Sequence, residues 1–286
     1  MDYYFFVLSV ICIWVIVSLS VNLVLGYAGL FSIGHVGYLG IGAYTTAVLN
    51  IIFKMDYFLT IPIAVVVTAL VALLTYLPLM RLTAFHFALS TLGMNVVIVD
   101  LLHNLAPRVP GAEGLFGLQA PEFMTTGVGR FGVVGAATVL CVLVALRVVN
   151  SPFGRTLRAL RDRPEAAEAI GKNPRFYRGV IWTLSGAFCG LAGGLYAVTL
   201  FYIDPTVFLV AFSFNVAVYI GVGGLASIAG SILGPALLIA FSEGLRFTGL
   251  PSDISGPAQQ ALFGALLILL MLFRRKGLIG RYEFRD

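Results

Sequence analysis

Long apolar runs are the feature that most limits what this chain can fold into. Nine stretches are long and apolar enough to cross a membrane, since a spanning helix needs about 20 mostly apolar residues. They cover residues 4–25, 33–53, 58–80, 84–102, 131–149, 179–201, 207–224, 227–247 and 257–273. A barrel strand is about half as long and alternates polar with apolar side chains, which these runs do not. The sequence therefore predicts an all-α, polytopic transmembrane helical bundle with roughly eight to ten spans.

Composition excludes the common soluble classes. Of the 286 residues, 59% are hydrophobic and 11% are charged, whereas an ordinary soluble domain carries about 25% charged residues. The 18 basic and 13 acidic side chains are too few to cover a soluble fold of this length. A soluble enzyme, a disordered regulator and a secreted disulfide scaffold are therefore excluded. The three cysteines stand singly in apolar runs, without the spacing of a metal or redox site.

The basic residues indicate the orientation. Thirteen of the 18 lie in two segments, eight between Arg147 and Arg178 and five between Arg274 and Arg285. Cytoplasmic loops are enriched in Lys and Arg, so both segments, and with them the C-terminus, are predicted to be cytoplasmic. Four predicted spans separate the segments, which keeps them on one side, and five precede the first, which places the N-terminus outside. The basic residues thus predict contact with a lipid membrane. Nucleic acid is not an expected partner, because no segment is long enough for a folded basic domain.

The loop over residues 151–178 is the longest polar stretch predicted to be cytoplasmic. Pro152 suits the first turn of a helix, and a second short helix is predicted after Pro164, ending at Gly171. A short helix between two spans can transmit force from a partner pressed against it. The alternative is a solvated basic loop that only sets the topology.

Glycine clusters mark three membrane segments. Residues 22–44 hold six glycines around a histidine, which favours close helix packing or a broken helix that lines a cavity. An intramembrane histidine is a functional candidate, and the alternative is a histidine bonded to a neighbouring span. The candidate residues of a translocation path are Asn22, Ser32, His35, Tyr44, Asn95 and Glu243.

The other two clusters lie later in the chain. Gly186, Gly190 and Gly194 are spaced four apart, which predicts tight packing of one helix face. The glycines between residues 221 and 234 predict a tight turn or a re-entrant kink between the spans 207–224 and 227–247.

Taken together, these segments resemble the LivM-type permeases of branched-chain amino acid ABC transporters. The blocks that carry the resemblance are NLVLGYAGLFSIGH (22–35), GIGAY (40–44), FALSTL (87–92), SPFGRTLRA (151–159), EAA (165–167), GVGGLASIAG (221–230) and FRRKGLIG (273–280). The sister LivH type usually carries Asn-Phe-Ala-His-Gly in its first block. This chain instead reads FSIGHVG over residues 31–37, which favours the LivM type.

The resemblance implies a single permease domain over residues 1–286 whose EAA segment is a coupling helix that docks on a cytoplasmic ATPase. The residues assigned to this contact are Glu165, Ala166, Ala167, Gly171, Arg158 and Arg161. The implied partners are a LivH-type second permease, two ATPase subunits that bind ATP and Mg, and a periplasmic or extracellular substrate-binding protein. The implied location is the cytoplasmic (inner) membrane of a bacterium or archaeon. No catalytic residue, metal or cofactor is expected in this chain.

The chain is not expected to hydrolyse ATP. Its only Gly-Lys pair, Gly171-Lys172, is followed by Asn173 and lacks the glycine loop of a phosphate-binding motif. The resemblance implies transport of branched-chain or related amino acids. Asn95 stands where the family commonly has glutamate, so a urea or short-amide permease remains an alternative. A stand-alone secondary transporter would need intramembrane carboxylates, and the predicted spans have very few.

Overall fold

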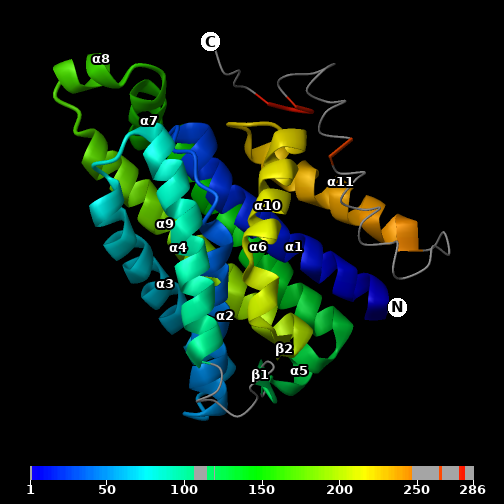
Figure 1. Cartoon of the computed structure of the whole chain (residues 1–286). Coiled ribbons are helices and arrows are strands. Elements are labelled where there is room, and N and C mark those ends of the chain that lie inside the picture. The colour runs from blue at the N-terminus through cyan, green and yellow to red at the C-terminus, as the bar shows by residue number, and fades with distance from the viewer. Residues whose placement is uncertain (1, 106–114, 119, 247–263, 266–276, 281–286) are drawn as a thin grey trace.

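A computed structural model describes residues 2–105, 115–118, 120–246, 264–265 and 277–280. Helices account for 83% of these residues, which confirms the predicted all-α polytopic bundle (Figure 1). The elements are α1 (Asp2–Asn22), the π-helical turn η1 (Leu23–Tyr27), α2 (His35–Ile51), α3 (Tyr57–Leu79), α4 (Ala84–Leu105), β1 (Leu115–Phe116), α5 (Glu122–Thr125), α6 (Gly127–Asn150), α7 (Pro152–Asp162), α8 (Pro164–Ala169), α9 (Pro174–Leu200), β2 (Tyr202–Ile203), the 3-10 helix η3 (Pro205–Phe208), α10 (Val210–Gly223) and α11 (Ile228–Arg246).

The number of spans differs from the nine predicted. Within the described residues, five helices are long and apolar enough to cross a membrane: α1 continued by η1, α3, α4, α6 and α9. The predicted spans 207–224 and 227–247 form α10 and α11, which are bent by 117° and count together as one further span at most. Helix α2 has only 17 residues, because the chain over residues 28–34 is not helical. The predicted span 257–273 lies outside the described residues except for 264–265.

Hydrogen bonds between helix ends define the two ends of the bundle. The Tyr57 hydroxyl at the start of α3 donates to the Gly194 carbonyl near the end of α9, at 3.1 Å. The Tyr76 hydroxyl near the end of α3 donates to the Arg175 carbonyl at the start of α9, also at 3.1 Å. Helices α3 and α9 therefore run antiparallel along the body. The helices α7 and α8 lie at the end where α9 begins, and β1, β2 and α5 lie at the opposite end (Figure 1).

The first and the last described segments of the chain lie at opposite ends of this bundle. Asp2 at the start of α1 lies against Gly127 at the start of α6, at the β1/β2 end. Residues 277–280 instead pack at the α7 end, where the Leu278 and Ile279 N–H groups donate to the carbonyls of Val222 and Gly223 at 2.9 and 3.1 Å. The loop 151–178 and residues 277–280 thus share one end.

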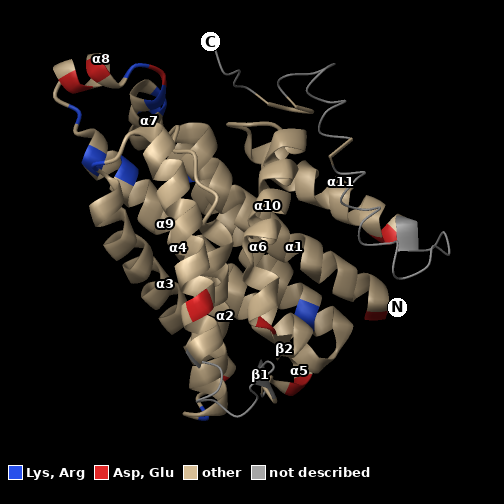
Figure 2. Cartoon of the chain, viewed as in Figure 1, with Lys and Arg blue, Asp and Glu red and all other residues tan. Residues whose placement is uncertain are grey.

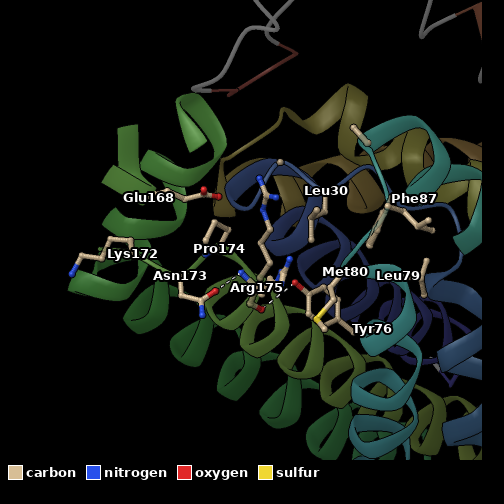
Figure 3. A pocket seen from close by; sticks show the side chains of 14 residues that line it. Leu30, Tyr76, Leu79, Met80, Phe87, Glu168, Lys172, Asn173, Pro174 and Arg175 are labelled. Atoms are coloured by element: carbon tan, nitrogen blue, oxygen red, sulfur yellow. Dashed lines mark hydrogen bonds between the residues drawn. The ribbon is translucent and has the colours of Figure 1, made fainter. Parts of the chain in front are cut away.

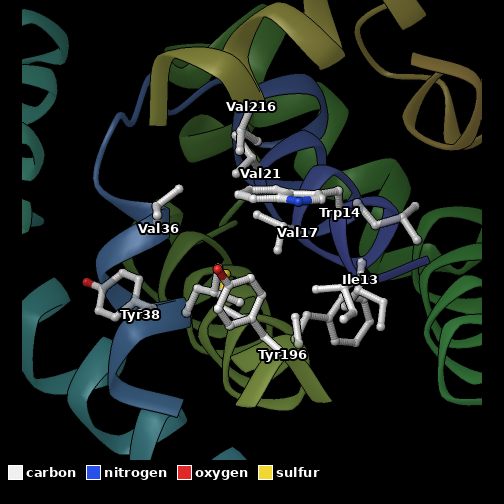
Figure 4. Packing of buried hydrophobic residues seen from close by; sticks show 14 of the residues in the cluster. Ile13, Trp14, Val17, Val21, Val36, Tyr38, Tyr196 and Val216 are labelled. Carbon is white, nitrogen blue, oxygen red and sulfur yellow. The ribbon is translucent and has the colours of Figure 1, made fainter. Parts of the chain in front are cut away.

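The core forms around α1 and α9. In the most apolar 18-residue stretch of each of these two helices, 72% of the residues are buried. The corresponding shares are 22% in α3 and 28% in α6, and these two helices expose many apolar side chains. Figure 4 shows Trp14 and Val17 of α1 gathered with Tyr196 of α9 and Val216 of α10. Apolar residues on the outside of a bundle suit a hydrocarbon solvent, so this distribution is that of a membrane protein.

Glycines allow α9 to approach its neighbours closely. Gly186 and Gly190 lie against Ala72 and Thr68 of α3, and Gly194 lies against Thr46 and Ile61. On a second side Gly190 contacts Gly42 of α2. A Cβ atom on Gly190 would stand 2.8 Å from the Thr68 Cβ, so no larger residue fits without moving a helix.

The close packing at Gly190 gives a first prediction. Gly190→Leu should lower the free energy of unfolding by about 2 kcal/mol or more, because the added side chain separates α9 from α2 and α3. Gly132→Leu on α6 is the control, because a Cβ atom there meets nothing within 4 Å. Thermal unfolding of the two purified variants in detergent measures the difference. Equal midpoints would show that the contact does not limit stability.

Candidate functional site

The loop between α6 and α9 is built from two short helices with marked boundaries. The Ser151 hydroxyl accepts a hydrogen bond from the Gly154 N–H at 3.3 Å and caps α7, and Pro152 follows at the first helical position. Arg163 leaves the helical conformation, and Pro164 then starts the six-residue α8. Gly171 ends the segment with a φ of +79°, in the left-handed region that glycine adopts without strain.

Helix α8 buries one side chain and exposes the others. Ala167 is 3% exposed and faces the rest of the chain, whereas Glu165, Ala166 and Gly171 are exposed. Ile170 directly follows the helix and is 72% exposed, which is unusual for a large apolar side chain in a polar loop. Ile170 is not among the residues predicted for this contact, although a large apolar residue between Ala169 and Gly171 in a polar loop is visible in the sequence. Its exposure adds an apolar contact point to the predicted docking surface.

Charge is concentrated at the same end. Figure 2 shows many charged residues on α7 and α8, while the helical body carries few. The basic residues of the loop 151–178 predicted this concentration of charge. Within the described part of the chain, the α7 end is therefore strongly polar. An exposed polar helix pair on an apolar bundle is a natural place for a water-soluble partner to bind.

Arg158 and Arg161, which were predicted to take part in the ATPase contact, make hydrogen bonds to backbone carbonyls within the chain. The Arg158 guanidinium donates to the carbonyls of Gly154 and Val149, both at 3.3 Å. The Arg161 side chain is 9% exposed, forms an ion pair with Asp162 at 2.8 Å and donates to the Gly26 carbonyl of η1. Both arginines therefore help to hold α7 against the bundle, because Arg158 reaches a carbonyl in the last turn of α6 and Arg161 reaches a carbonyl of η1.

A third arginine completes this attachment. The Arg178 guanidinium of α9 donates to the Leu160 carbonyl of α7 at 3.3 Å. Helix α7 is thus bonded to the end of α6 through Arg158, to η1 through Arg161 and to α9 through Arg178. A displacement of α7 would pull on all three of these elements.

Asn22 of α1 braces the break between α10 and α11. Its amide nitrogen donates to the Ser227 carbonyl at 2.9 Å and to the Ser231 hydroxyl at 2.6 Å, and its oxygen accepts from the Ala226 N–H at 3.0 Å. The side chain is fully buried. Both donors and the acceptor of this amide are used within the protein, so the contacts are those of a structural clamp.

Ser32 and His35 lie at the start of α2 beside an aromatic cluster. The Ser32 hydroxyl and the His35 Nδ1 are 3.0 Å apart, and the His35 ring lies 5.0 Å from the Trp182 ring. Phe87 and Tyr76 also contact Trp182, which joins α2, α3, α4 and α9. His35 Nε2 has no hydrogen-bond partner among the described residues. His35 thus contacts the neighbouring span α9 through its ring, and its Nδ1 is hydrogen-bonded to Ser32 of its own segment. The void beside it has a volume of about 10 Å³.

Tyr44 and Asn95 come together around η3. The Asn95 amide donates to the Phe208 carbonyl at 3.3 Å, and the Tyr44 ring lies 6.4 Å from the Phe208 ring. The Tyr44 hydroxyl and the Asn95 oxygen are buried without partners among the described residues. Two unsatisfied polar groups beside an irregular turn are compatible with a path that opens in another conformation.

Glu243 lies apart from the other candidates, at the β1/β2 end. Its carboxylate accepts a hydrogen bond from the Tyr3 hydroxyl at 2.5 Å. It lines a cavity of about 330 Å³ between α1, α9, α10 and α11, together with Trp14, Asn215 and Tyr219. The structure therefore distributes the six path candidates over four places.

Comparisons with known proteins point to membrane permeases. The family described as branched-chain amino acid transport system, permease component, matches residues 3–273. The chain is 29% identical to the high-affinity branched-chain amino acid transport system permease protein LivM of Escherichia coli (strain K12) and 30% identical to LivM of Salmonella typhimurium, with 93% of this chain and 68% of each relative covered. The guanosine ABC transporter permease protein NupQ of Bacillus subtilis is 25% identical, with 90% of this chain and 85% of the relative covered. No solved structure matches significantly.

The clamp at Asn22 gives a second prediction. Asn22→Ala should lower the free energy of unfolding by about 2–3 kcal/mol, because it leaves the buried Ala226 N–H without a partner and removes the bonds to the Ser227 carbonyl and the Ser231 hydroxyl. Asn104→Ala is the matched control, since Asn104 is exposed and makes one hydrogen bond within α4. Thermal unfolding in detergent compares the two variants. An Asn22 variant as stable as the Asn104 variant would contradict the clamp.

Proposed function

The chain belongs to the family of branched-chain amino acid transport system permease components, and from that premise we propose that it is the membrane-spanning subunit of an ATP-driven importer. The family match, the multi-pass apolar helices and the LivM relatives support this function. The single observation that carries the proposal is α8, a short and largely exposed helix at the polar end of an apolar bundle. It is placed where a soluble motor protein could reach it.

We propose that α8 is the coupling helix. Glu165, Ala166 and Gly171 are its exposed contact residues, and Ile170 adds an apolar side chain that a groove on the partner can bury. Ala167 holds the inner side of the helix. The small alanines let the partner approach closely, and the carboxylate of Glu165 offers an ion pair.

The hydrogen bonds from α7 to neighbouring elements can transmit a movement of the loop into the bundle. Arg161 joins α7 to Gly26 of η1, and Asn22, four residues earlier, holds the turn between α10 and α11. Arg178 joins α7 to α9, which crosses the bundle against α2 and α3. A partner that moves α8 would therefore move both α9 and the α10–α11 turn. A π-helical turn such as η1 is a common position for such adjustments.

The proposed assembly has several subunits. A LivH-type second permease would complete the path, and two cytoplasmic ATPase subunits would bind ATP and Mg. A periplasmic or extracellular binding protein would deliver the solute at the β1/β2 end. In this arrangement the loop 151–178 and the C-terminus face the cytoplasm, in keeping with their Lys and Arg content. The membrane is then the cytoplasmic (inner) membrane of a bacterium or archaeon.

The solute proposed is a branched-chain or related amino acid. The cavity at Glu243 has a carboxylate suited to an ammonium group, the Asn215 amide, and the rings of Trp14 and Tyr219 against which an aliphatic side chain can pack. Its volume of about 330 Å³ lies within the range of small-molecule sites. Urea or a short amide, the alternative from the sequence, would not use the carboxylate as a charge partner.

The coupling assignment gives a third prediction. Ile170→Asp and Glu165→Arg should abolish ATP-driven uptake and reduce copurification of the ATPase subunits at least tenfold, because a charge replaces the buried apolar contact or inverts the ion pair. Ile170→Leu should keep both. Phe53→Asp is the control for copurification, because Phe53 is 66% exposed at the opposite end. Normal copurification and uptake with Ile170→Asp and Glu165→Arg would refute the docking surface.

The solute assignment gives a fourth prediction. Proteoliposomes of the complete transporter should take up leucine in preference to urea and guanosine. Glu243→Gln should reduce uptake at subsaturating leucine about tenfold, through the loss of a charge-assisted hydrogen bond. Glu122→Gln, at an exposed glutamate on α5, should have no effect. Preferred uptake of urea would establish the alternative, and equal rates for the Glu243 and Glu122 variants would exclude the cavity.

A further inference from the structure

Two depressions adjoin each other where α3 ends and α9 begins. The first is a pocket of about 470 Å³ beneath the α8–α9 connection, and the second is a groove of about 670 Å³ between α3 and α9. Tyr76, Met80 and Arg175 line both. A polar pocket and an apolar groove thus meet at one arginine.

The pocket carries more positive than negative charge. Arg175, Arg178 and Lys172 line it, with Glu168 as the one acidic side chain in its lining. Figure 3 shows Glu168, Asn173 and Arg175 on one side of the pocket and Leu30, Phe87 and Met80 on the other, with Lys172 extending outward at the rim. The net charge favours an anionic group.

The backbone around Arg175 is fixed, and its side chain is available. The Asn173 oxygen accepts from the Arg175 N–H at 3.0 Å, and the Tyr76 hydroxyl donates to the Arg175 carbonyl at 3.1 Å. The exposed Arg175 guanidinium has no hydrogen-bond or ion-pair partner in the described part of the chain. The nearby Arg178 Nε is buried and likewise unpaired among those residues. Two guanidinium groups therefore have N–H donors to spare.

The groove is apolar along its length. It extends from Phe176 past Gly179 and Val180 to Ala187 on α9, with Leu73 facing it from α3. Gly179 leaves room for the Tyr76 ring, which would lie 2.9 Å from a Cβ atom at that position. The stretch from Arg175 to Ala187 spans about 18 Å of helix, close to the length of an extended acyl chain.

We propose that this pair of depressions binds one anionic glycerophospholipid. The phosphate accepts hydrogen bonds from Arg175 and Arg178, the headgroup hydroxyls donate to Glu168, and one acyl chain lies in the groove between α3 and α9. Basic pockets between spanning helices are known recognition sites for lipid phosphates. The site adjoins the connection that joins α8 to α9, so a bound lipid would stabilise the position of that connection. The lipid assignment stands independently of the transported solute.

Native mass spectrometry of the full chain in detergent tests the proposal. Phosphatidylglycerol should bind as one tightly held molecule, at least tenfold more strongly than phosphatidylcholine or phosphatidylethanolamine. Arg175→Gln should weaken phosphatidylglycerol binding about fivefold, the effect of one basic residue at a lipid surface. Val180→Trp should weaken binding of the acyl chain by filling the groove.

Matched variants separate this site from general effects. Arg155→Gln removes an exposed arginine of the same loop that lines neither depression, and Val139→Trp enlarges an exposed valine on α6. Both should bind phosphatidylglycerol like the unmodified chain. Equal losses in Arg155→Gln and Arg175→Gln would overturn the proposal, because binding would then depend only on total charge.

Two further outcomes would also overturn it. Equal binding of phosphatidylethanolamine would show that the site does not select an anion. If free inorganic phosphate displaced bound phosphatidylglycerol as well as unlabelled lipid does, the pocket would bind anions and the groove would contribute nothing to binding. In membranes containing the whole transporter, a photoactivatable phosphatidylglycerol should crosslink to peptides of α3 and α9. A crosslink from a photoreactive residue at position 180 to a protein subunit in place of lipid would assign the groove to a protein partner.

Discussion

The close approach of α9 to α2 and α3 is the contact on which the rest of the structure depends. A bilayer provides no hydrophobic force that would drive apolar helices together, so packing of small residues must supply much of the attraction. Gly190 brings three helices into contact at one point, since it touches Thr68 of α3 and Gly42 of α2. The same helix begins at the polar loop and ends beside β2. It is therefore the element through which the two ends of the protein are joined.

The arginines at the α7 end extend this packing into a polar region. Each guanidinium bonds a backbone carbonyl at or near the end of a helix, where the carbonyls lack partners within the helix. Arg161 reaches η1, and Arg178 reaches α7. These bonds are directional and lie at the boundary between apolar and polar surfaces. They add to the apolar packing of the buried Leu157 and Leu160 in fixing the position of the loop.

Much of the fold was predictable from the sequence, because apolar runs and basic loops report directly on the solvent around each segment. The helix boundaries of α3, α6 and α9 lie close to the predicted runs, and the glycine-rich region near residue 224 contains the predicted break. Side-chain direction was not predictable. The spacing of Arg158 and Arg161 predicts that both lie on one face of a helix. It does not predict which other helix that face contacts. Likewise Asn22 and Glu243 have partners more than 200 residues away.

The size of α8 has a consequence for assembly. An isolated helix shorter than about 12–15 residues is only marginally stable in water, because the first turn costs more entropy than its hydrogen bonds return. Helix α8 has six residues, and its ends are set by Pro164 and by the turn at Gly171. It takes its shape only when α6 and α9 hold the two ends of the loop in place. The surface that we propose for the motor thus forms only on a permease whose membrane helices have already packed, and an unfolded chain does not present it.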